Sequence, residues 1–150
     1  MKIAIGSDHA GFQLKEEIIQ VLQAEKYSVV DCGSFSAAPV DYPDIAEQVV
    51  QKVLSQRIPG ILICGTGIGI SIAANKFAGI RAALCHDTFS ARLAREHNDA
   101  NILAIGARIT GPGLAAEIVK TFLAAEFAGD RHQKRLDKIS LIENKYMERS

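Results

Sequence analysis

Residues 61–71 read Ile-Leu-Ile-Cys-Gly-Thr-Gly-Ile-Gly-Ile-Ser, and this stretch decides the fold. Its apolar start is typical of a short buried strand, and three glycines at alternate positions allow a tight turn with exposed backbone N–H groups. A helical pattern resumes over residues 70–76. In an open α/β sheet, the turn between a strand's carboxyl end and the next helix is where anionic ligands bind. We therefore expect a ligand site at this turn.

Cys64 stands at the edge of this expected site. A thiol beside a helix N-terminus is a candidate thiolate, able to take a proton or to attack an electrophile. Inert packing is the alternative, because cysteine is among the most often buried residues, but the glycine turn favours the reactive interpretation. Cys32 and Cys85 are widely spaced and form no Cys-x-x-Cys pair, so the sequence suggests neither a disulfide framework nor a zinc site.

The composition predicts one domain over residues 1–150. The chain is 48% hydrophobic and 23% charged, which suffices for one sizeable core. Seventeen basic and seventeen acidic residues give zero formal net charge, so no overall field attracts nucleic acid or an anionic membrane. The sequence has no charged-then-apolar leader, and no apolar run approaches the roughly 20 residues of a membrane span. We expect a cytoplasmic protein that binds neither nucleic acid nor membrane.

Strand and helix patterns alternate along the chain with short turns. This alternation predicts a Rossmann-like (flavodoxin-like) three-layer αβα sandwich around a five-stranded parallel sheet, with the strand order left open. Asp44 and Asp87 are expected to cap their helices. Strands are expected at residues 2–7, 28–31, 60–64, 81–85 and 102–105, and helices at residues 12–25, 44–56, 70–76, 87–96 and about 114–125.

An extra helix with no following strand is predicted over residues 131–146. Its apolar residues lie at helical spacing, so it needs a surface to pack on, either its own domain or a second subunit. Arg131 and Arg135 are four residues apart and share one face. Two adjacent guanidiniums form a cradle for phosphate, or else a solvated basic face. The apolar residues are Leu136, Ile139, Ile142 and Tyr146.

Four motifs in the chain support a family resemblance. They are Cys64-Gly-Thr-Gly-Ile-Gly69 with Ala74-Asn-Lys76, Ser7-Asp8-His9-Ala10-Gly11, His97-Asn98-Asp99-Ala100-Asn101, and Gly129-Asp-Arg131-His-Gln-Lys-Arg135. With these motifs the sequence resembles the type B ribose-5-phosphate isomerases of the ribose/galactose isomerase family, from residue 2 to about residue 142. The resemblance implies a Rossmann-like sheet, a homodimer or dimer of dimers, no metal and no cofactor. It implies interconversion of ribose 5-phosphate and ribulose 5-phosphate.

The resemblance also implies catalytic roles. Moving a carbonyl between C1 and C2 needs a base for the C2 proton and donors for the negative charge of the enediolate. By resemblance Cys64 is the base, and His97 with Thr66 opens the sugar ring. The donors are implied to be backbone N–H groups of the turn that contains Gly65, Gly67 and Gly69.

Binding roles are implied in the same way. Asp8 and Asn98 match positions that hold sugar hydroxyls. The C-terminal helix, about residues 127–150, is implied to pack on a neighbouring subunit and to bring two arginines to that subunit's site, which makes the site composite. The residues implied to bind phosphate are His9, Arg108, Arg131 and Arg135.

Several alternatives remain open. Related proteins isomerise allose 6-phosphate or galactose 6-phosphate, although the full motif set in one chain favours the pentose. A dinucleotide-binding module would use the glycine turn, but Ile70 stands where the third glycine of G-x-G-x-x-G belongs. A non-catalytic regulatory domain of this fold is a further alternative. A metal enzyme would have to use residues that lack common ligand spacing, namely Asp8, His9, His86, Asp87 and His97.

Overall fold

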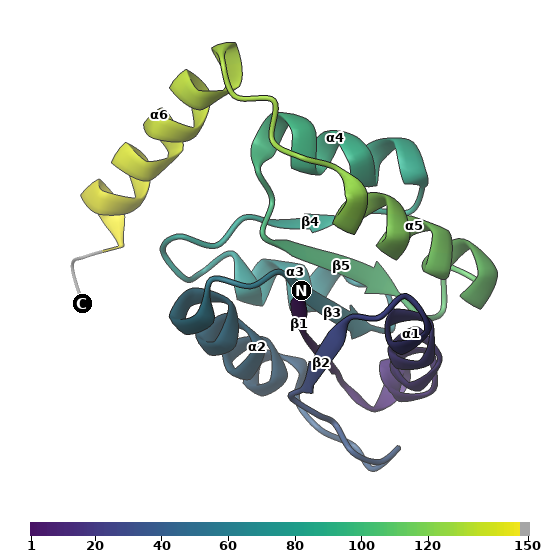
Figure 1. The fold of residues 1–150 in the computed structure, drawn as a ribbon. Coiled ribbons are helices and arrows are strands. Elements are labelled where there is room, and N and C mark those ends of the chain that lie inside the picture. The colour runs from purple at the N-terminus through teal and green to yellow at the C-terminus, as the bar shows by residue number, and fades with distance from the viewer. Residues whose placement is uncertain (148–150) are drawn as a thin grey trace.

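The computed structural model describes residues 1–147. Within them lies one five-stranded parallel sheet in the order β2-β1-β3-β5-β4 (Figure 1), which confirms the predicted sheet. This order differs from the flavodoxin order 2-1-3-4-5 by exchange of the last two strands, so the middle strand β3 has β1 and β5 as neighbours. The strands are β1 (Lys2–Ser7), β2 (Ser28–Asp31), β3 (Gly60–Cys64), β4 (Ala82–Leu84) and β5 (Ile102–Gly106).

Helices cover both faces of the sheet, as predicted. One layer holds α1 (Phe12–Ala24), α4 (Thr88–Asn98) and α5 (Pro112–Ala124), and the other holds α2 (Tyr42–Gln56) and α3 (Ile68–Ala74). A short 3-10 helix, η1 (His9–Gly11), precedes α1. The last helix, α6 (Arg131–Tyr146), projects away from the three layers (Figure 1). Every helix within residues 1–147 is too short or too polar to cross a membrane.

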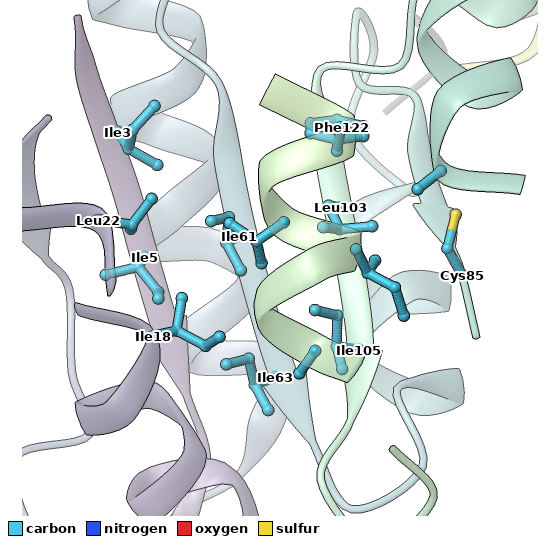
Figure 2. Packing of buried hydrophobic residues seen from close by; sticks show 14 of the residues in the cluster. Ile3, Ile5, Ile18, Leu22, Ile61, Ile63, Cys85, Leu103, Ile105 and Phe122 are labelled. Atoms are coloured by element: carbon cyan, nitrogen blue, oxygen red, sulfur yellow. The ribbon is translucent and has the colours of Figure 1, made fainter. Parts of the chain in front are cut away.

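Successive residues of β3 point into two different cores. Ile61 and Ile63 pack in the first core with α1 and α5 (Figure 2), and Leu62 and Cys64 pack in the second with α2 and α3. Side chains alternate along a strand, and a parallel strand covered on both faces is apolar throughout, which explains the uninterrupted apolar run. The side chain of Cys64 therefore belongs to the α2–α3 side of the sheet.

The two predicted helix caps had different outcomes. Asp87 caps α4, because its carboxylate accepts a hydrogen bond from the Ser90 N–H at 2.6 Å. The prediction for Asp44 was wrong, since α2 begins at Tyr42 with Asp41 at the N-cap and Asp44 lies in the first turn. Pro43 explains the earlier start, because proline is well suited to the first turn of a helix, where its missing N–H costs nothing.

A buried ion pair fixes the loop that follows β2. The Lys15 ammonium, on α1, lies 2.7 and 2.8 Å from the two carboxylate oxygens of Asp31 and has no solvent exposure. The rings of Phe12 and Phe35 flank the ammonium at 5.5 and 5.3 Å. Asp31 also accepts a hydrogen bond from the Gly33 N–H at 2.9 Å. Together these contacts hold the start of the loop over residues 32–41 against α1.

We predict that Asp31→Ala lowers the free energy of unfolding by roughly 3 kcal/mol, because it leaves the buried Lys15 ammonium with only the half-exposed Glu16 carboxylate, 3.4 Å away, as a counter-charge. Lys15→Met removes the charge and keeps most of the volume, so it should cost about 1 kcal/mol or less. Urea denaturation of both variants measures the difference. Equal losses from the two substitutions would contradict this account of the pair.

Candidate functional site

The turn between β3 and α3 encloses the thiol of Cys64. Its sulfur accepts a hydrogen bond from the Gly67 N–H at 3.1 Å, and the residue is 4% exposed. Gly67 has a φ of 77°, which favours glycine, and a Cβ there would lie 2.5 Å from Leu84 Cδ1. Thr66 is exposed at the top of the turn and accepts a hydrogen bond from the Ile68 N–H at 3.2 Å. The sequence Gly-Thr-Gly thus places a sulfur and a hydroxyl on one short turn.

Residues from two neighbouring strands flank this turn. Asp8 follows β1, is 6% exposed, and accepts a hydrogen bond from the Gly11 N–H at 3.1 Å. Arg108 follows β5, and its N–H donates to the Gly65 carbonyl at 2.9 Å. The guanidinium of Arg108 lies over Gly65, since a Cβ on that glycine would be 3.3 Å from Nη1. The carboxyl edge of the sheet therefore gathers a carboxylate, a thiol and a guanidinium.

His9 is oriented by the loop that follows β2. Its Nδ1 accepts a hydrogen bond from the Val40 N–H at 3.2 Å. A nitrogen that accepts carries no hydrogen, so the hydrogen of the ring is on Nε2. His9 can therefore offer one N–H to an anion, at the same edge as Asp8.

Tyr42 is a residue of this edge that the sequence analysis missed. Its ring packs against Gly69, where a Cβ would lie 2.6 Å from Cζ and 2.9 Å from the phenol oxygen. The side chain is 39% exposed. In the sequence Tyr42 is one residue of a helix start, and nothing in its local pattern indicates contact with the glycine turn.

His97 and Asn98 lie at the opposite edge of the sheet. They belong to the last turn of α4, which begins after the carboxyl end of β4 and returns the chain to the amino edge. Just beyond, the Asn101 carbonyl accepts a hydrogen bond from the Gly60 N–H at 2.9 Å, at the start of β3. A strand rises about 3.3 Å per residue, so the start of β3 and Cys64 are about 13 Å apart. One chain does not bring His97 to its own Cys64.

The start of α6 rests on His97. The ring of His132 stacks on the ring of His97, with centroids 4.2 Å apart and planes inclined by 13°. His132 is 7% exposed, whereas Arg131 and Arg135 are exposed on the same helix. Burial lowers the pKa of His132, the positive charges of His97, Arg131 and Arg135 act in the same direction, and Asp130 opposes them. The predicted residues His97, Arg131 and Arg135 thus form one basic cluster around His132 at the amino edge of the sheet.

Two further features bear on these groups, the distribution of possible metal ligands and a cavity at the amino edge. Within residues 1–147, no three His, Cys, Asp or Glu side chains gather to hold a metal ion. A cavity of about 700 Å³ opens at the amino edge, and none of the predicted site residues lines it. Arg81 and Arg95 in its wall both pair with Asp99, at 3.2 Å each, so two guanidiniums share one carboxylate.

Comparisons with known proteins agree on one family. The sequence model of the family Ribose/Galactose Isomerase matches residues 3–139. The chain is 51% identical to ribose-5-phosphate isomerase B of Escherichia coli (strain K12), over 96% of this chain and 97% of that one. Ribose-5-phosphate isomerase B of Clostridium thermocellum superposes with a TM-score of 0.96 at 55% identity, covering 97% and 99% of the two chains. That of Mycoplasma genitalium, solved with bound ribulose-5-phosphate, has a TM-score of 0.91 at 44% identity, covering 96% and 97%.

The lowered pKa of His132 predicts a loss of stability in acid. Below pH 6.5, the ordinary pKa of histidine, His132 binds a proton in the unfolded chain more readily than in the folded chain. The free energy of unfolding therefore falls as the pH drops from 6.5 towards the pKa of His132 in the folded chain. Above that range the contribution is fully present. His132→Phe, which cannot be protonated, should lose less stability between about pH 7 and pH 5. Thermal unfolding of both proteins across this range is the measurement, and parallel losses would contradict the prediction.

Proposed function

The chain belongs to the ribose/galactose isomerase family, and we propose that it interconverts ribose 5-phosphate and ribulose 5-phosphate. It is an aldose-ketose isomerase, as its relatives are. The names of those relatives support the pentose phosphate as substrate, and the bound ribulose-5-phosphate of the Mycoplasma genitalium protein supports it further. The observation that carries the proposal is the thiol of Cys64, held in a turn of backbone N–H groups between Asp8 and Arg108.

In the proposed mechanism Cys64 moves one proton. As thiolate it takes the proton from C2 of the open-chain aldose, and the electron pair of that bond forms the C1–C2 double bond while the carbonyl oxygen gains negative charge. Backbone N–H groups of residues 65–69 stabilise this enediolate, and one lost donor of this kind costs on the order of 10²–10³ in rate. The C2 hydroxyl then loses its proton to O1, and the thiol returns its proton to C1. Atoms and charge balance without a cofactor.

Ring opening needs a second group, which we assign to His97 assisted by Thr66. Because His97 lies at the amino edge of its own sheet, the proposal requires a second copy of the chain that brings its His97 to the first copy's Cys64. Such an arrangement makes each site composite and supplies two sites per symmetric dimer. A monomer would then have almost no activity.

Unpartnered apolar surface supports this dimer. Beside the glycine turn, Ile68 and Ile72 of α3 are 51% and 55% exposed. The helix α6 meets its own domain at His132, Leu136 and Glu143, and a cavity of about 370 Å³ remains between α6 and the edge strand β4. A second copy would cover these surfaces, since burial of apolar area is the main favourable term in association. The exposed apolar residues of α6 are Ile139, Leu141, Ile142 and Tyr146.

The remaining proposed roles divide between the two copies. Asp8 from one copy and Asn98 from the other would hold sugar hydroxyls. The phosphate would lie between His9 and Arg108 of one copy and Arg131 and Arg135 of the other. An Nε2–H from His9 and three guanidiniums match the negative charge and the oxygens of a phosphate.

The proposed reaction is tested by the initial rate of ribulose 5-phosphate formation from ribose 5-phosphate, with purified protein, excess chelator and no added nucleotide. A kcat/KM of about 10⁴ M⁻¹s⁻¹ or more is expected for an enzyme acting on its own substrate. Faster turnover of allose 6-phosphate or galactose 6-phosphate would contradict the pentose assignment. No turnover of any of the three by the folded protein would refute the reaction.

Cys64→Ala tests the proton transfer. Loss of a positioned acid–base group should lower kcat by a factor on the order of 10²–10⁴ while the fold stays intact. Cys85→Ala is the matched control, because Cys85 is also a buried thiol at the carboxyl end of a strand, and burial raises its pKa to about 11. The control variant should keep the wild-type kcat. Equal rates from the two variants would remove Cys64 from the mechanism.

A further inference from the structure

The stacked rings of His97 and His132 are where α6 rests on α4. His97 lies in the last turn of α4 and His132 in the first turn of α6, and their planes are inclined by only 13°. The connecting segment is held at the same place, because the Ala128 N–H donates to the Glu96 carbonyl at 2.9 Å. The ring of His97 thus has one face covered by a buried partner that is itself tied down.

A stack orients an imidazole without using its nitrogens. Among the histidines of residues 1–147, His9 alone has a hydrogen bond to a ring nitrogen, so neither nitrogen of His97 is occupied there. A general acid must keep a nitrogen free for the substrate, and it must also be held within a narrow range of orientations. Contact through the ring face satisfies both requirements, because it fixes the plane and leaves both nitrogens at the rim.

We propose that His132 is a positioning residue for ring opening: its buried ring fixes the plane of His97, so that a His97 nitrogen reaches the ring oxygen of the sugar phosphate in the other copy's site. This inference rests on the proposed function, in which His97 is the ring-opening group. His132 itself touches neither the substrate nor the base.

The charges around the pair favour a neutral His132. Two protonated rings 4.2 Å apart would repel each other, and Arg131 and Arg135 add further positive charge, against which Asp130 is the opposing group. Burial, the first cause, lowers the pKa of His132 as well. An uncharged His132 ring can stack on His97 without adding to the positive charge of the two arginines.

Two substitutions of His132 in the full chain test the inference. His132→Leu keeps the buried volume and removes the flat ring, so kcat for ribose 5-phosphate should fall about tenfold, within the usual worth of correct orientation. KM and the inhibition constant of inorganic phosphate should stay at wild-type values, because Arg131 and Arg135 are unchanged. His132→Phe restores a flat ring and should recover most of the lost kcat.

Leu136→Ala is the matched control for a loosened helix. Leu136 is buried on the same face of α6, one turn after His132, and has no contact with the acid–base step. Loosening α6 moves both arginines, so this variant should raise KM and the inhibition constant of phosphate more than it lowers kcat. If the His132 variants likewise raised KM and the inhibition constant of phosphate more than they lowered kcat, His132 would be only a structural residue and the inference would be refuted.

The inference and the proposed function fail in different ways. A wild-type protein that does not isomerise ribose 5-phosphate refutes the function, and the inference with it. Wild-type turnover together with an unchanged kcat in His132→Leu refutes the positioning role alone. A His132→Phe variant as slow as His132→Leu refutes it too, since the flat ring would then not be the property that matters.

Discussion

The strands β1, β3 and β5 run parallel, and this direction determines where every proposed site residue lies. Because the three strands run the same way, their carboxyl ends meet at one edge and bring Asp8, Cys64 and Arg108 together. The same constraint forces every connection to return to the amino edge before the next strand begins. The last turn of α4, with His97, is therefore at the far edge. The parallel topology therefore gathers the groups around the Cys64 thiol at one edge and leaves the His97 imidazole of the same chain at the other edge.

Packing on both faces of the sheet makes this edge rigid. Ile61, Leu62 and Ile63 of β3 have no exposure. The turn after Cys64 packs so closely against β4 and β5 that Gly67 has no room for a side chain. The loop over residues 32–41 is fixed by polar contacts. The Lys15–Asp31 pair holds its start, and the Val40 N–H near its end donates to His9 and orients that ring. Rigid surroundings of this kind are what a positioned proton acceptor and a set of backbone donors need.

Much of the fold could be predicted from the sequence because its signals are local. The apolar run that ends at Cys64 predicts a buried strand, and Asp87 before a helical pattern predicts a helix start. The structure confirms both predictions. The start of α2 was predicted two residues late, because Asp44 has the side chain of a capping residue, although Pro43 before it already lies in the first turn. Strand order was not predictable, since no local pattern says that β5 rather than β4 pairs with β3.

The groups of the proposed site can be recognised one by one in the sequence, whereas their arrangement in space cannot. The glycine turn, the carboxylate after β1 and the basic pair on α6 each have a recognisable spacing. The stack of His132 on His97 has none, because it joins two helices far apart in the chain and a polar helix position is usually solvated. Tyr42 was missed for the same reason, as its contact with Gly69 exists only after α2 and α3 have packed. Contacts between distant segments require the fold itself.

We propose that each site takes Cys64 from one copy of the chain and His97 from another, and subunit mixing separates this arrangement from a site within one chain. Cys64→Ala and His97→Ala, each nearly inactive alone, are unfolded together, refolded and assayed with ribose 5-phosphate. A mixed dimer with composite sites has one doubly altered site and one intact site, so random pairing should restore about a quarter of the wild-type activity. A mixture no more active than the two variants measured separately would contradict the account.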